Sequence, residues 1–245
     1  MASTHKTRIK ILGISGSPRR GGNTEFLLRE ALSSAGSVDY GIVETELYSI
    51  AGKKFLPCIG CSGCSKGGRC IFEKDDDFSE LRDKWADSDA VIMAVPVYHM
   101  GIPGQLKCFI DRLGNSVDRP YPRPPKRLVV YGAIAQGVDL FSGVEHAATQ
   151  IINHALIMGG VVVAGDGPEA YIGGGGWAKT MKKEALKNSY RNKTSDAKLA
   201  VDASRSLGRR VADLALILKA GALHFTDALS RDPVYAPLIE RIRCR

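Results

Sequence analysis

The sequence lacks long apolar stretches and is poor in aromatic residues. Aromatic side chains make up 7% of the 245 residues, and no apolar run approaches the roughly 18 to 20 residues that a transmembrane helix needs. The first ten residues are mostly polar, so the sequence predicts neither a signal peptide nor a membrane anchor. We therefore expect a cytoplasmic protein built around one core.

The sequence also lacks a recognisable nucleic-acid-binding motif. Its formal net charge is +8, but no aromatic residues are interleaved with the basic ones. The charge suits nucleic acid, an anionic surface or a phosphorylated cofactor, and solvated lysines explain it most simply. A non-catalytic module that contacts nucleic acid or an acidic partner through residues 179–193 is the alternative outside the enzyme classes. Such binding would weaken with salt in proportion to the phosphates neutralised.

Two common nucleotide-binding motifs are missing, namely the Walker loop and the dinucleotide pattern G-x-G-x-x-G. Instead, apolar residues 8–14 run into a loop of glycine and hydroxyl residues at 15–24. Helical spacing follows from Phe26 to Leu32, and Asn23 stands where an N-cap is expected. Backbone N–H groups, hydroxyls and Arg19 could hold a terminal phosphate there. Similar loops occur without a ligand, so the loop alone leaves both possibilities open.

Four of the six cysteines fall within residues 57–70, which we call the cysteine turn. Their spacing is C-x2-C-x2-C-x5-C, and glycines such as Gly60 and Gly63 allow a tight turn. A compact run resembles the pattern of cubane iron–sulfur clusters, whereas structural zinc usually takes two separated pairs. Zinc and free redox-active thiols remain alternatives, and a disulfide framework is disfavoured in a reducing compartment. The candidate ligands are Cys58, Cys61, Cys64 and Cys70.

A further loop, residues 96–104, follows the apolar strand predicted at 90–95. It lies at the carboxyl end of that strand, the edge where open α/β sheets bind ligands. We interpret His99 as a packing or hydrogen-bonding residue and assign it no catalytic role. Cys108 falls on the buried face of the next predicted helix, so we interpret it as a core residue and not a metal ligand.

Together these motifs resemble a known family. Residues 13–19, 22–24, 96–98, 105–107 and 109–112 look like the NADPH-dependent FMN reductase group of flavodoxin-like proteins. The cysteine turn narrows the resemblance to the iron–sulfur flavoproteins of anaerobic archaea and bacteria. The likeness covers residues 8 to 166, and two independent motifs in the right order are more specific than either alone.

The resemblance implies an α/β fold, a flavodoxin-like doubly wound parallel five-stranded sheet of order 2-1-3-4-5 with FMN at its carboxyl edge. The fourth strand would be 127–134 and the fifth 160–165. We expect the cysteine turn at the same edge as the FMN. The residues implied for the phosphate are Ser15, Ser17, Arg19, Asn23 and Thr24. Those implied for the isoalloxazine ring are Pro96, Val97, Tyr98 and His99, with Ala135, Gln136 and Gly137 approaching it.

The resemblance further implies a flavin-dependent oxidoreductase in which a [4Fe-4S] cluster and FMN exchange electrons. A redox partner such as a ferredoxin or a small molecule would complete the transfer, NAD(P)H is a candidate substrate, and a homo-oligomer is expected. The cofactors would supply the chemistry, so no protein nucleophile is expected. The alternative is an NAD(P)H-dependent FMN or quinone reductase whose cysteines bind zinc or nothing.

The rest of the chain is less distinctive. We place a flavodoxin-like domain at residues 1–221 and a C-terminal extension at 222–245, which packs on the domain or on a partner subunit. Six glycines from Gly165 to Gly176 predict a loop that lies over a site, reaches a neighbouring subunit or is a mobile surface loop. Apolar spacing over 196–219 predicts an amphipathic helix. Cys244 is expected to be an exposed thiol.

Overall fold

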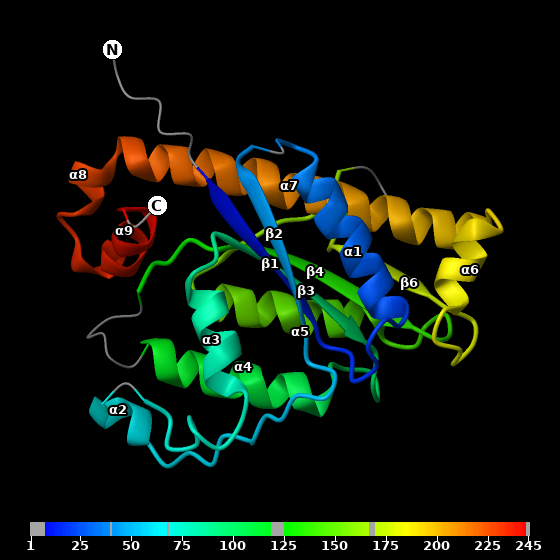
Figure 1. Cartoon of the computed structure of the whole chain (residues 1–245), viewed down its shortest axis with the longest axis horizontal. Coiled ribbons are helices and arrows are strands. Elements are labelled where there is room, and N and C mark those ends of the chain that lie inside the picture. Colours follow the sequence, from blue (N-terminus) through cyan, green and yellow to red (C-terminus); the bar gives the residue numbers. More distant parts are fainter. Residues whose placement is uncertain (1–7, 40, 68, 119–124, 167–169, 244–245) are drawn as a thin grey trace.

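The protein, represented by a computed structural model that describes residues 8–39, 41–67, 69–118, 125–166 and 170–243, has a parallel β-sheet between two helical layers (Figure 1). Cys244 lies outside the described residues. The strands are β1 Ile9–Ser15, β2 Val43–Ser49, β3 Ala90–Pro96, β4 Val130–Gly137, β5 Val161–Val162 and β6 Gly174–Trp177. The order β2-β1-β3-β4-β5 confirms the predicted flavodoxin-like topology.

Successive side chains of the buried strands belong alternately to two halves of the core, one on each face of the sheet. In β3, Val91, Met93 and Val95 contact the half under α3 Phe78–Ala86, α4 Gly104–Asp118 and α5 Val144–Ile157. The intervening alanines and Ile92 belong to the half under α1 Asn23–Gly36 and α7 Ser195–His224. Successive side chains of a strand point to opposite faces, so helices cover both sides of the sheet (Figure 1).

One face of the long helix α7 is charged and points outward. Its opposite, apolar face packs on α1. Among the described helices none combines the length and the apolar character needed to cross a bilayer.

The prediction of a loop throughout 165–176 is wrong, because Gly174, Gly175 and Gly176 form most of strand β6. This strand pairs with the second half of β4, while β5 pairs with the first half. A Cβ on Gly176 would lie 2.6 Å from Ala200 Cβ of α7, and one on Gly174 would lie 3.1 Å from Ser204 Oγ. Glycine is needed here for close approach of a helix, and not for flexibility.

The fourth and fifth strands, predicted at 127–134 and 160–165, have different bounds in the structure. Strand β4 extends from Val130 to Gly137, so Ala135, Gln136 and Gly137 belong to the strand and not to the loop after it. Strand β5 is limited to Val161–Val162, because β6 takes its place along the rest of β4. Beyond β1, β2 and β3, the carboxyl edge of the sheet is therefore formed by the end of β4 and by β6, and not by β5.

The C-terminal extension packs on the chain's own domain at the opposite, amino-terminal edge of the sheet (Figure 1). Helix α7 continues past residue 221 to His224, and α8 Thr226–Leu229, a short 3-10 turn at Pro233–Tyr235 and α9 Ala236–Arg243 follow. Leu238 and Ile242 of α9 pack against Ala222 of α7. The extension thus continues the same folded body.

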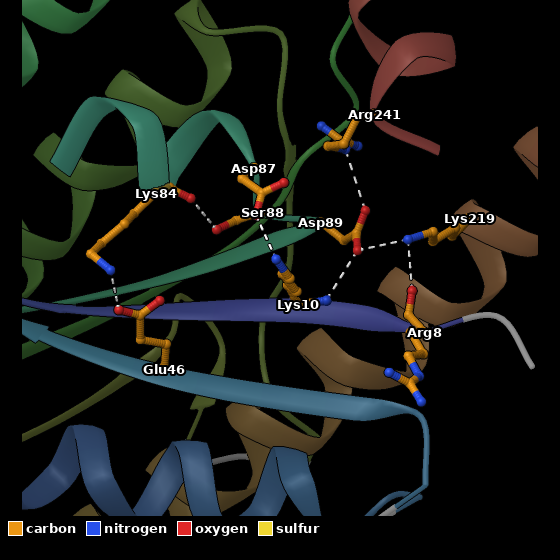
Figure 2. Close-up of polar contacts among 9 residues, drawn as sticks. All are labelled: Arg8, Lys10, Glu46, Lys84, Asp87, Ser88, Asp89, Lys219 and Arg241. Atoms are coloured by element: carbon orange, nitrogen blue, oxygen red, sulfur yellow. Dashed lines mark hydrogen bonds and ion pairs between the residues drawn. The ribbon is translucent and has the colours of Figure 1, made fainter. Parts of the chain in front are cut away.

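Buried charges tie this extension to the sheet (Figure 2). Asp89, immediately before β3, lies 3.0 Å from Lys219 Nζ and 3.3 Å from Arg241 Nε, and all three side chains are at most 7% exposed. The Lys219 ammonium also donates to the Arg8 carbonyl at 2.6 Å, and the Lys10 N–H donates to Asp89. One carboxylate thus joins α7, α9 and two strands.

A buried histidine on α5 makes stability dependent on pH. His154 packs edge-on against Tyr131, and its Nε2 has no hydrogen-bond partner among the described residues. Burial lowers the pKa of His154 from 6.5 to about 4. The unfolded chain therefore takes up this proton first as the pH falls, so the stabilisation is complete above pH 6.5 and is lost towards pH 4.

Between pH 6.5 and pH 4, the free energy of unfolding falls because His154 is buried. We predict that this fall is smaller by about 3 kcal/mol in His154→Leu than in the unsubstituted protein. Urea unfolding at a series of pH values measures this difference. His146→Leu, which changes an exposed histidine of the same helix, should leave the pH dependence unchanged. Parallel pH profiles for unsubstituted protein and His154→Leu would contradict the prediction.

Candidate functional site

A cavity of about 350 Å³ opens at the carboxyl edge of the sheet, where β1, β3 and β4 end. It lies between the loop after β1, the loop after β3 and the segment after β6. The residues that line it are Ser17, Arg19, Gly22, Asn23, Thr24, Pro96, Val97, Tyr98, His99, Gln136, Gly137, Val138, Thr180, Met181 and Lys183. We call it the edge cavity.

The structure brings together at the edge cavity all the residues implied for the cofactor except Ser15 and Ala135. Both exceptions are fully buried strand residues with no exposed area. The Ser15 hydroxyl has no hydrogen-bond partner within the described chain. Neither side chain therefore presents surface to a ligand in the cavity.

The loop after β3 is held in an unusual backbone conformation. Tyr98 and Gly101 exchange two backbone hydrogen bonds of 2.9 Å, and between them His99 and Met100 have φ values of +46° and +66°. Two left-handed residues in a two-residue turn are usually glycine, asparagine or aspartate, so this turn is strained. The preceding residue is fixed by a bond of 2.8 Å from Val97 N–H to the Gln136 carbonyl. The turn presents Tyr98 and His99 to the edge cavity.

The loop after β1 is joined to the segment after β6 by two side chains that the sequence assigned to a phosphate. Arg19 Nη1 donates to the Met181 carbonyl at 2.9 Å, and Asn23 Nδ2 donates to the Lys182 carbonyl at 3.0 Å. Asn23 Oδ1 accepts from Leu186 N–H. The expected N-cap role of Asn23 is wrong, since Gly22 is the N-cap and Asn23 is the first residue of α1.

The buried carboxylate of Glu25 holds the backbone of the same loop. It is 2% exposed and accepts hydrogen bonds from Gly21 N–H at 2.8 Å and from Arg29. Burial by itself would raise the pKa of Glu25, but these two donors lower it below its usual value. The carboxylate therefore stays ionised and holds Gly21 at a left-handed φ of +66°.

Sequence reasoning missed five lining residues, of which Thr180, Met181 and Lys183 come from one segment. This segment follows β6 and is tied to the end of β4 by bonds from Ala178 N–H to the carbonyl of Gly137, the last residue of β4, and from Lys179 N–H to the carbonyl of Val138, which follows it. Its basic character was visible, but no motif links it to a loop about 160 positions earlier. Val138 and Gly22, the other two, adjoin predicted residues.

Lys183 adds a positive charge beside the phosphate-type loop. Its Nζ lies 4.0 Å from the position a Cβ on Gly21 would take. If FMN binds at this loop, as the resemblance implies, Lys183→Ala should raise the Kd for FMN up to about tenfold at low salt, because the attraction between an exposed positive charge and the phosphate would be lost. Titration of flavin-free protein with FMN, and with riboflavin, measures the effect.

Riboflavin has no phosphate, so its Kd should not change in Lys183→Ala. Lys182→Ala, which alters the adjacent lysine outside the edge cavity, is the matched control and should bind FMN normally. An equal loss of FMN and riboflavin affinity would show that Lys183 acts on the loop structure and not on the phosphate.

The four cysteines of the cysteine turn line a second, smaller cavity of about 60 Å³. Cys58 and Cys61 are exposed, and Cys64 and Cys70 are half-buried. The turn contains the short helix α2 Gly63–Gly67, with left-handed residues at Gly60 and Ser62. We call this the cysteine cavity.

The cysteine cavity is not at the position the sequence suggested. Its other walls come from Phe72 and from the C-terminal half of α4, namely Arg112, Asn115 and Ser116, and it shares no described lining residue with the edge cavity. Helix α4 begins at Gly104, close to the edge cavity, and Arg112 lies about 12 Å further along its axis. In Figure 1, α2 is likewise at the far end of α4 from the strand ends.

Lining one cavity does not place the sulfurs around one point. Within the described residues, no group of three or more histidine, cysteine, aspartate or glutamate side chains is arranged so that it could hold a metal ion. The donor chemistry nevertheless suits an iron–sulfur group, since four thiols face one cavity from a single turn. Cluster binding would require the turn to draw these sulfurs together.

The predicted packing of Cys108 on the core is confirmed. The residue lies on α4, packs against the core and does not line either cavity. Burial, followed by the nearby Asp111, raises the pKa of the Cys108 thiol. A thiol with little thiolate at neutral pH is a poor metal ligand.

Comparison with known proteins connects the chain to a family. The family model described as NADPH-dependent FMN reductase matches residues 9–168. An iron–sulfur flavoprotein of Methanocaldococcus jannaschii is 36% identical over 216 residues, covering 86% of this chain and 100% of the relative. One from Archaeoglobus fulgidus is 37% identical over 169 residues, covering 69% and 83%. A WrbA-like flavodoxin from Agrobacterium tumefaciens shares the fold, with a TM-score of 0.51, 15% identity and coverage of 84% and 97%.

Proposed function

This chain belongs to the NADPH-dependent FMN reductase family and is a flavin-dependent oxidoreductase that uses FMN, and we propose that its cysteine turn holds a [4Fe-4S] cluster. In this proposal the protein passes electrons between the cluster and FMN. The cluster would be ligated by Cys58, Cys61, Cys64 and Cys70. The FMN would occupy the edge cavity.

The observation that carries the proposal is that all four cysteines of the turn line one cavity. Their compact spacing suits thiolate ligation of a cubane cluster. Relatives at 36% and 37% identity bear the name iron–sulfur flavoprotein, which supports the same assignment. Cluster binding would bring together the four sulfurs, which are not arranged as metal ligands in the described turn.

The edge cavity supplies what FMN binding requires. Arg19, Lys183 and the amino-terminal end of α1 offer positive charge and N–H donors to a phosphate. Tyr98 and Val97 provide ring and aliphatic surface for the isoalloxazine. FMN itself accepts and donates electrons, and these residues would orient it and exclude water.

Anaerobic purification and reconstitution with iron and sulfide test the proposal. We expect about four iron atoms, about four sulfides and about one FMN per chain, with a broad absorption shoulder near ~400 nm that dithionite bleaches. Flavin absorption without that shoulder, together with iron far below one cluster per chain, would refute the cluster.

Two observations favour a second candidate, an NAD(P)H-dependent FMN or quinone reductase without a cluster. The cysteine side chains of the described turn are not gathered as metal ligands, and the family model carries the description of a reductase. In that case a Cys58→Ser/Cys61→Ser variant would oxidise NADPH with a quinone as fast as the unsubstituted enzyme. Under the leading proposal, transfer that passes through the cluster would be lost.

The electron partner is proposed to be a ferredoxin-like protein or a small-molecule acceptor, and the protein is proposed to be a homo-oligomer. Apolar surface beside the edge cavity supports association between copies. Phe141, in the loop after Val138, is 88% exposed, and Leu140 is 57% exposed. Sedimentation velocity of unsubstituted protein and Phe141→Ser would test this, with a lower mass expected for the variant.

A further inference from the structure

A buried arginine forms one wall of the cysteine cavity. Arg112 of α4 is 2% exposed, and its guanidinium carbon lies 4.1 Å from the centre of the Phe78 ring. The residue lines the cavity together with the four cysteines. A permanent positive charge in such a place is costly unless it is fully compensated.

Protein groups accept hydrogen bonds from only one of the guanidinium nitrogens, Nη1, within the described chain. Arg112 Nη1 donates to the Asp76 carboxylate and, at 3.3 Å, to the Leu56 carbonyl. Asp76 is itself buried and also accepts from Leu56 N–H at 2.7 Å and Phe78 N–H at 3.1 Å. This carboxylate therefore shares its charge among several donors.

The other side of the guanidinium is not used within the described chain. Arg112 Nε and Nη2 are both buried and have no hydrogen-bond partner there. Buried N–H donors of a charged group without acceptors are rare and indicate a missing ligand or solvent. The cavity that Arg112 borders is lined by four sulfurs, which accept hydrogen bonds as thiolates or as cluster ligands.

From this arrangement we infer that Arg112 is the charge-compensating hydrogen-bond donor of the group bound at the cysteine turn, and that it sets the reduction potential of that group. The inference rests on the proposed cluster. Asn115 reinforces it from the next turn of α4, since its Nδ2 lies 3.9 Å from Cys58 Sγ. The acceptors would be thiolate or sulfide sulfurs of an anionic group.

The direction of the effect follows from charge. A cluster ligated by four thiolates is anionic and becomes more negative by one charge when it accepts an electron. A guanidinium at a buried site stabilises the more negative state, so Arg112 raises the potential. Loss of the charge should therefore favour the oxidised cluster about tenfold, which corresponds to a shift of ~59 mV to more negative potential for one electron.

The test compares cluster potentials in reconstituted, FMN-loaded protein. Arg112→Gln leaves the Asp76 carboxylate buried without its arginine and could unfold the turn, so Arg112→Gln/Asp76→Asn is measured against Asp76→Asn, and the difference between these two variants reports the Arg112 charge alone. Arg112→Lys retains the charge but loses the forked donor geometry, and it should restore part of the potential. Anaerobic dithionite titration gives the cluster and flavin potentials of one sample.

Two controls separate this role from a structural one. The FMN potential is an internal reference that should stay fixed, because Arg112 does not line the edge cavity. Arg82→Gln is the matched variant, since Arg82 also lies over Phe78 but not beside the cysteines. Arg82→Gln should leave both potentials unchanged.

Each outcome decides the inference. A cluster potential that is more negative in the double variant than in Asp76→Asn, with full iron content and partial recovery in Arg112→Lys, supports it. Equal cluster potentials in the iron-replete double variant and in Asp76→Asn overturn the inference while the cluster proposal stands. If the unsubstituted protein binds no iron, both fail together.

Discussion

With the proposed cluster at the cysteine turn, a Cys58→Ser/Cys61→Ser variant is expected to lose essentially all of its iron while it keeps its FMN. Serine oxygen is a poor ligand for iron that is otherwise bound by thiolate sulfur, and two of four ligands cannot hold a cubane cluster. The flavin should remain because the cysteine and edge cavities share no described lining residue. Iron, sulfide and flavin analysis after reconstitution measures all three components.

Cys108→Ser is the matched control for this loss. This substitution removes a single thiol, on α4, that packs on the core outside the cysteine cavity. Full iron content in Cys108→Ser and none in the double variant would assign the iron to the turn. Equal iron in all three proteins would show that iron binds elsewhere or adventitiously.

Asp89→Asn is expected to lower the free energy of unfolding by about 3–5 kcal/mol, the largest stability effect predicted for this protein. The substitution removes the carboxylate that lies 3.0 Å from Lys219 Nζ and 3.3 Å from Arg241 Nε at a buried site (Figure 2). Both cations then lose their negative partner in a region that excludes water. Urea unfolding followed by circular dichroism measures the change.

The control lies two residues away. Asp87 pairs with Lys10 at 2.6 Å, but their side chains are 54% and 40% exposed, and an exposed pair contributes about 0–1 kcal/mol. Asp87→Asn should therefore have little effect. A similar small loss in both variants would show that the Asp89 contacts do not anchor α7 and α9.

Strand and helix positions were accessible from sequence because each depends on local pattern. The near-continuous apolar run of residues 90–95 matches β3, since strands buried on both faces leave no room for polar residues. The loops at 15–24 and 96–104 contain small, polar and glycine residues, and they follow β1 and β3 directly. Parallel strands carry such loops to one edge, which explains why most of the implied flavin residues line one cavity.

The glycines at 174–176 could not be assigned correctly from sequence. Glycine is common in loops because of its backbone freedom, and nothing local indicates that a helix will pack against it. Here the requirement is steric and comes from Ala200 of α7, about 25 positions later. Asn23 was misassigned for the same reason, because its partners Lys182 and Leu186 come from distant sequence.

By itself the sequence determined the order of strands and helices, the phosphate-type loop and a compact set of four thiols, because these follow from residue type and spacing. Only the tertiary structure decided that the thiols line a cavity of their own along α4, away from the edge cavity. It also placed Arg112 beside them and Lys183 beside the phosphate-type loop. Burial and charge compensation are properties of segments brought together by folding, and no local pattern encodes them.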